Sequence, residues 1–100
     1  MATWFHDLET NGCWHWKSQH VEIDLIPNLN EKHEGFTEYD MSFRFIDFHA
    51  ISNGMYVAKD LASAQRMAVR MAHDTLMEFR DTALEADIEI QKEMKRCRES

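Results

Sequence analysis

The fold is decided by residues 38–45, which read Glu38-Tyr39-Asp40-Met41-Ser42-Phe43-Arg44-Phe45. Large apolar side chains alternate here with polar ones without interruption. Because successive side chains of a strand point to opposite faces, this alternation is typical of a β-strand with one buried and one solvated face. The pattern predicts a strand whose odd-numbered residues face the core.

A second strand is predicted at residues 21–26, where Val, Ile and Leu stand at the odd positions and Glu and Asp between them. Pro27 is expected to end this strand, since proline cannot donate a ladder hydrogen bond, and residues 28–35 are expected to form a loop. After the strand predicted at residues 38–45, Phe48 does not continue the alternation that places Phe45 on the core face. This indicates either a bulge near residue 47 or packing of residues 46 and 48 on the other face.

Two Asn-Gly pairs predict tight turns, because these residues tolerate the positive φ that such turns require. Asn11-Gly12 would join residues 3–8 and 13–17 as a hairpin. Asn53-Gly54 would turn the chain into a last strand at residues 55–58.

A long helix is predicted after Asp60, a candidate N-cap, because no Gly or Pro follows and apolar residues recur at steps of three and four. One helix of about 40 residues would reach about 60 Å, whereas the strands cover about 20 Å. We therefore expect a break or kink near residues 80–85. The alternative is a projecting helix that pairs with a second copy through an apolar stripe made of Ala83, Ala86, Ile90 and Met94.

These elements predict an α+β fold in which an antiparallel sheet of three to four strands precedes a long C-terminal helix, either continuous or kinked or broken. A length of 100 residues fits one domain over residues 1–100. No apolar run approaches the length of a membrane span, and the chain is expected to be cytoplasmic. Cys13 and Cys97 do not resemble a disulfide framework.

The net charge of -7 is concentrated in the sheet region, where residues 1–59 carry nine acidic against four basic side chains. Such a balance opposes direct binding of nucleic acid, which relies on clustered Lys and Arg. It favours a basic partner protein or nucleoprotein complex.

Four acids, Glu22, Asp24, Glu38 and Asp40, are expected on the solvated face of the two best strands. If the strands are neighbours, like charges would meet across them at a small cost in stability. This cost suggests a function, namely binding to a basic protein groove. The alternative is an ordinary solvated face whose charge Lys17, Lys32 and Arg44 partly neutralise.

Cys13, His15 and His20 could in principle hold a metal, but their spacing matches no zinc signature, and no metal or cofactor is expected. No Gly-rich phosphate loop and no nucleophile with an orienting base can be identified. The sequence therefore favours a protein without enzymatic activity.

Residues 53–58, Asn-Gly-Met-Tyr-Val-Ala, followed by Asp60-Leu61-Ala62-Ser63-Ala64 at the start of an Ala-rich helix, resemble the strand-turn-strand-helix layout of small phage-encoded proteins of the anti-CRISPR type. The resemblance covers residues 37–79. It implies an inhibitor that binds a host nuclease complex in the host cytoplasm. The alternative function is a structural or assembly protein that forms a homodimer through its C-terminal helix.

Overall fold

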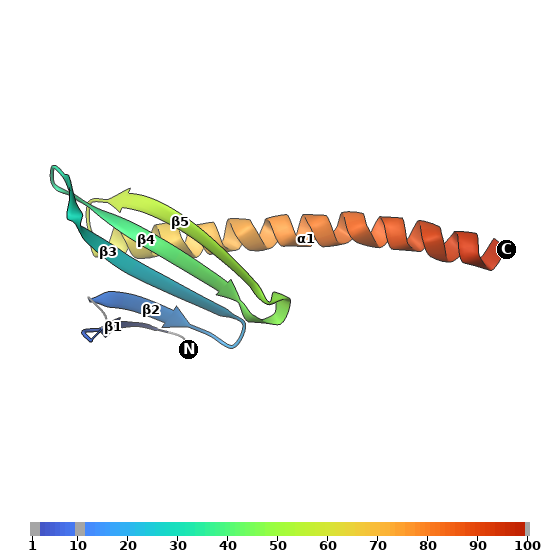
Figure 1. The fold of residues 1–100 in the computed structure, drawn as a ribbon, viewed down its shortest axis with the longest axis horizontal. Helices are drawn as coiled ribbons and strands as arrows, with labels where there is room; N and C mark the ends of the chain where they lie inside the picture. The colour runs from blue at the N-terminus through green and yellow to red at the C-terminus, as the bar shows by residue number, and fades with distance from the viewer. Residues whose placement is uncertain (1–2, 10–11, 100) are drawn as a thin grey trace.

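The computed structural model describes residues 3–9 and 12–99, with only the backbone described for residues 30–33. Five strands form one antiparallel sheet in chain order, and one long helix follows them (Figure 1). The α+β prediction is confirmed, with five strands instead of three to four. The elements are β1 (Trp4–Asp7), β2 (Cys13–Lys17), β3 (Val21–His33), β4 (Phe36–Phe45), the short 3-10 helix η1 (Ile46–Phe48), β5 (Ala50–Ala58) and α1 (Leu61–Glu99).

Helix α1 crosses one face of the sheet and leaves the other face without a covering element (Figure 1). It contacts the sheet through Ala64, Ala68 and Ala72, which are buried and spaced four residues apart on one side of the helix. Their small side chains allow a close approach over the large side chains of the strands. The buried strand residues of this core are Ile23, Leu25, Tyr39, Met41, Phe43, Phe45 and Ala58.

The hairpin of β1 and β2 forms as predicted, and Gly12 has the positive φ of 73° that favours glycine. Asn11 lies outside the described residues. The second Asn-Gly pair does not form a turn, so that prediction is wrong. Gly54 instead lies in the middle of β5 under α1, where an added Cβ would come within 2.7 Å of Met71 Cε. Close packing of the helix, and not a turn, explains this glycine.

The connection between β4 and β5 is η1 together with His49, which adopts a left-handed φ of 50°. Neither expected arrangement around Phe48 occurs, because β4 ends at Phe45 and the chain leaves the sheet there. The ring of Phe48 is exposed and lies 5.8 Å from the ring of Phe79.

Pro27 does not end the strand predicted at residues 21–26. This strand is β3, which continues to His33 through most of the loop expected at residues 28–35. Pro27 pairs with Tyr39 of β4, whereas β2 pairs with β3 only as far as Leu25. One edge of β3 is therefore unpaired at Pro27, and a missing N–H can be tolerated on that side. The register shifts between Asn28 and His33, so an irregularity precedes the turn into β4.

The predicted break near residues 80–85 does not occur, because α1 is continuous from Leu61 to Glu99. The packed part ends near Phe79, and all residues from 80 to 99 are exposed. Intrahelical contacts continue in the exposed part, including a 2.7 Å hydrogen bond from Gln91 to Asp87 and an ion pair between Arg96 and Glu93. The molecule is consequently elongated, measuring 65 × 27 × 20 Å.

No helix in the described part of the chain combines the length and the apolar character needed to cross a membrane.

The buried aromatic core provides a first test of the fold. Phe43 is 1% exposed, whereas Phe36 at the start of the same strand is 50% exposed. We expect Phe43→Ala to lower the free energy of unfolding by about 3–5 kcal/mol, because it leaves a cavity under α1. Phe36→Ala should cost less than about 1 kcal/mol. Chemical denaturation of both variants measures the difference, and equal losses would contradict the described core.

The start of α1 provides a second test. Asp60 Oδ1 accepts a 2.8 Å hydrogen bond from the backbone N–H of Ser63, as an N-cap does. Hydrogen bonds from the Ser63 hydroxyl and backbone hold the pKa of Asp60 below its ordinary value. A carboxylate with a lowered pKa in the folded state stabilises the protein above its unfolded-state pKa, and that contribution is lost as the pH falls through the folded-state pKa.

Asp60→Ala should therefore lower the melting temperature at pH 7, and Asp60→Asn, which keeps a capping oxygen, should lower it less. The gap between wild type and Asp60→Ala should narrow once the pH falls below about 4. Thermal unfolding followed by circular dichroism from pH 7 to pH 2 measures this gap. A gap that widens in acid would contradict the capping role.

Candidate functional site

The uncovered side of the sheet, called the outer face below, carries all four acids that the sequence singled out. Strand pairing aligns the outward residues in rows that cross the sheet. The residues of four such rows are Lys17, Glu22, Arg44 and Ile51; Phe5, His15, Asp24, Ser42 and Asn53; Ile26, Asp40 and Met55; and Asn28, Glu38 and Val57.

The expectation that like charges meet across β3 and β4 is wrong, because the register gives each acid a different neighbour. Glu22 lies opposite Arg44, with 3.8 Å between the carboxylate and the guanidinium. Glu38 lies opposite Asn28 and accepts a 2.9 Å hydrogen bond from its amide. Sequence reasoning could not find these pairs, because the register of two strands cannot be deduced from their alternation.

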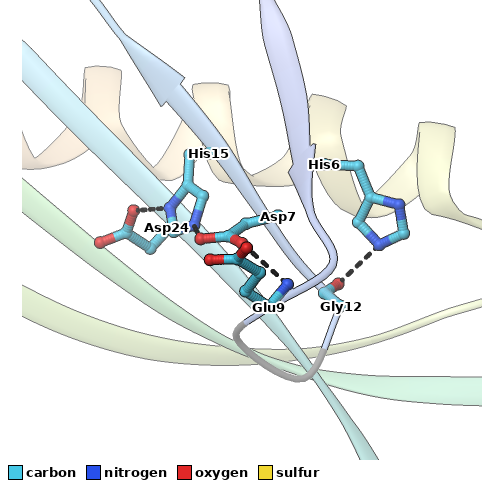
Figure 2. Close-up of polar contacts among 6 residues, drawn as sticks. All are labelled: His6, Asp7, Glu9, Gly12, His15 and Asp24. Carbon is cyan, nitrogen blue, oxygen red and sulfur yellow. Dashed lines mark hydrogen bonds and ion pairs between the residues drawn. The ribbon is translucent and has the colours of Figure 1, made fainter.

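Asp24 of β3 lies opposite His15 of β2, and the two side chains form a hydrogen bond (Figure 2). His15 Nδ1 donates to Asp24 Oδ1 over 2.5 Å, and His15 Nε2 lies 3.8 Å from Asp7 Oδ2. Asp7 also accepts a 3.0 Å hydrogen bond from the backbone N–H of Glu9. His15 thus links β1, β2 and β3 at their outer face, because its ring lies between the carboxylates of Asp7 and Asp24.

Asp40 differs from the other three acids. It is exposed, and it lies between Ile26 on β3 and Met55 on β5 in the same row. Among the described residues it makes no ion pair. Asp40 is therefore the acid of the outer face that is most available to a partner.

Large apolar side chains accompany the acids, a feature that the sequence analysis did not identify. Phe5, Ile26, Ile51 and Met55 all belong to the outer face and are 39% to 62% exposed. Lys17 Nζ lies 5.8 Å from the centre of the Phe5 ring. A shallow pocket of about 430 Å³ adjoins this surface and is lined by Glu22, Arg44, Ile46, His49 and Ile51. Acidic and apolar groups are thus interspersed over the same sheet surface.

The three residues considered for a metal are not brought together. His20 lies beyond the end of β2, where its Nδ1 donates to Asp47 over 2.5 Å, whereas Cys13 begins β2 and is buried. His15 is held by Asp24. In the part of the chain that the structure describes, no group of three His, Cys, Asp or Glu side chains could hold a metal ion.

The predicted helix stripe forms a second candidate surface. All of its residues, Ala83, Ala86, Ile90 and Met94, are exposed on the part of α1 that extends beyond the sheet. Leu84 and Ile88 are also more than half exposed.

Comparisons of this chain with protein-family models, with curated proteins and with solved structures found no match.

Proposed function

We propose that this protein is a non-enzymatic protein-binding module whose outer face docks on a basic partner protein. The observation that supports this most is the uncovered sheet face, on which acidic and exposed large apolar side chains are interspersed. The acids of this face are Asp7, Glu22, Asp24, Glu38 and Asp40, against the bases Lys17 and Arg44.

The row of Ile26, Asp40 and Met55 would form the centre of the contact. Exposed apolar side chains grouped on one face are typical of interaction surfaces, and their burial provides affinity. The carboxylates attract a basic partner and orient it. A Lys or Arg side chain fits this row best, because its aliphatic part can cover the apolar groups while its charge reaches Asp40.

The resemblance to anti-CRISPR proteins extends the proposal to the class of partner. The strand-turn-strand-helix order of residues 37–79 is present in the fold, with the turn at η1 instead of Asn53-Gly54. If the resemblance reflects a common role, the partner is the basic surface of a host complex that handles nucleic acid. An acidic face would occupy the place of the nucleic-acid backbone on such a surface.

The proposal predicts that Asp40→Lys abolishes capture of basic proteins. The wild-type protein, immobilised at low salt, should retain them from a lysate of the host and release them as the salt rises, because screening weakens exposed charge contacts. Asp74→Lys provides the matched control, since it changes the net charge equally at an exposed position of α1. Mass spectrometry of the retained proteins measures both effects.

A contribution of the apolar groups is tested by Met55→Ala, which keeps the charge of the face. Loss of a Met side chain at the centre of an interface should weaken binding of the captured partner about tenfold or more. Equal capture by wild type and Asp40→Lys, or equal loss in Asp40→Lys and Asp74→Lys, would refute docking by the outer face.

A further inference from the structure

The end of α1, residues 80–99 and here called the distal segment, lies beyond the part of the helix that packs on the sheet, and the described contacts that support it lie within the helix itself. It comprises 20 residues, about 30 Å of helix, and all of them are exposed. Leu84, Ile88, Ile90 and Met94 are each more than half exposed. Helices in proteins derive most of their stability from packing of an apolar side against a neighbouring element. The distal segment therefore needs a partner surface.

The apolar stripe of the distal segment lies on the same side of α1 as the residues that pack on the sheet. At 100° per residue, Ala83, Ala86, Ile90, Met94 and Cys97 all fall within about 80° of the mean direction of the buried alanines 64, 68 and 72. The sheet covers this side up to Phe79, and no described element covers it beyond that residue (Figure 1). Any occupant of the stripe must therefore lie end to end with the sheet along α1.

The charges of the distal segment are divided between its two halves. Residues 81–89 carry four acids, Asp81, Glu85, Asp87 and Glu89, and no base. Residues 92–98 carry four bases, Lys92, Lys95, Arg96 and Arg98, and one acid. Two copies aligned in the same direction would place acid beside acid and base beside base. Two copies aligned in opposite directions would place each acidic half beside a basic half.

We propose that the distal segment binds the distal segment of a second copy of this chain as an antiparallel helix pair with its two-fold axis near Ile90. In this alignment Ile90 meets its own counterpart, Met94 meets Ala86, and Cys97 meets Ala83. On either side of the Ile90 pair, each larger side chain then faces a smaller one, as interdigitated packing requires. This pairing is independent of the docking proposed for the outer face.

The position of the sheet also excludes a parallel pair. A parallel partner helix in register would continue along the same side of α1 into residues 61–79, where the sheet lies. An antiparallel partner helix ends near residue 80, so the sheet and the second helix share one side of α1 without overlap. Phe48, which is 61% exposed at that end of the sheet beside Phe79, offers an apolar contact for the end of the partner helix.

Ile90→Asp should convert a dimer into a monomer, because it places two carboxylates at the two-fold axis. Its matched control is Leu84→Asp, since Leu84 has nearly the same exposure but lies about 120° away around the helix. Sedimentation equilibrium over a range of protein concentrations measures the mass of each. Circular dichroism verifies that both variants remain helical.

The charge division is tested by two double variants. Glu85→Lys with Glu89→Lys gives the distal segment a net positive charge, and Lys95→Glu with Arg98→Glu makes its net charge more negative. Each variant alone should dimerise about tenfold or more weakly than wild type at low salt, and an equimolar mixture of the two should form a heterodimer. Retention of full affinity by each variant alone would refute the charge pairing.

Orientation is tested by mild oxidation, which joins thiols that lie close together. The variant Ile90→Cys with Cys97→Ser should form a disulfide-linked dimer, whereas the native Cys97 pair, about 21 Å apart along the axis, should not. A Cys97–Cys97 dimer, a dimer that survives Ile90→Asp, or a monomer at every concentration would overturn the proposal. If the protein is a monomer at every concentration, the stripe of the distal segment binds a different protein instead of a second copy. Asp40→Lys should still dimerise and Ile90→Asp should still capture basic proteins, so the failure of either proposal is distinguishable.

Discussion

The close contact of α1 with the sheet, made through Ala64, Ala68 and Ala72, is the constraint on which the rest of the structure depends. Three small residues at a spacing of four let the helix approach the strands, and the absence of a side chain at Gly54 leaves room for Met71. The large strand side chains, Phe43 and Phe45 among them, are nearly inaccessible as a result. Burial of each such side chain stabilises the fold by about 1.5–3 kcal/mol.

Because the described part of the chain has one α-helix and one sheet, this contact leaves the opposite face of the sheet uncovered. Antiparallel sheets tolerate a solvated face, so no covering element is required for stability. The polar groups of that face are partly paired with one another, as Glu22 with Arg44 and Asp24 with His15. Pairing reduces the field of the acids but does not account for the apolar side chains between them, such as Ile26 and Met55. Their exposure beside Asp40 is the reason for regarding the outer face as a binding surface.

The same contact sets the direction of α1, and the helix then continues past the end of the sheet for 20 residues. Good helix-forming residues and intrahelical pairs such as that of Gln91 with Asp87 support the extension, and none of the described elements folds back to cover it. The outer face and the distal segment therefore expose separate surfaces, one acidic and apolar, the other divided into an acidic and a basic half.

The sequence by itself determined the elements whose signals are local. These are the alternating strands at residues 21–26 and 38–45, the hairpin that turns at Gly12, the start of the helix at Asp60 and the stripe of Ala83, Ala86, Ile90 and Met94. Periodicity and capping act within a few residues, so they can be identified without knowledge of the fold. Only the tertiary structure decided that Pro27 is tolerated within β3, that Gly54 accommodates α1 instead of forming a turn, and that each acid faces Arg44, His15, Asn28 or Ile26. These outcomes depend on which strand edge is paired, on the register of neighbouring strands and on how closely the helix packs, and such quantities arise only when distant segments meet.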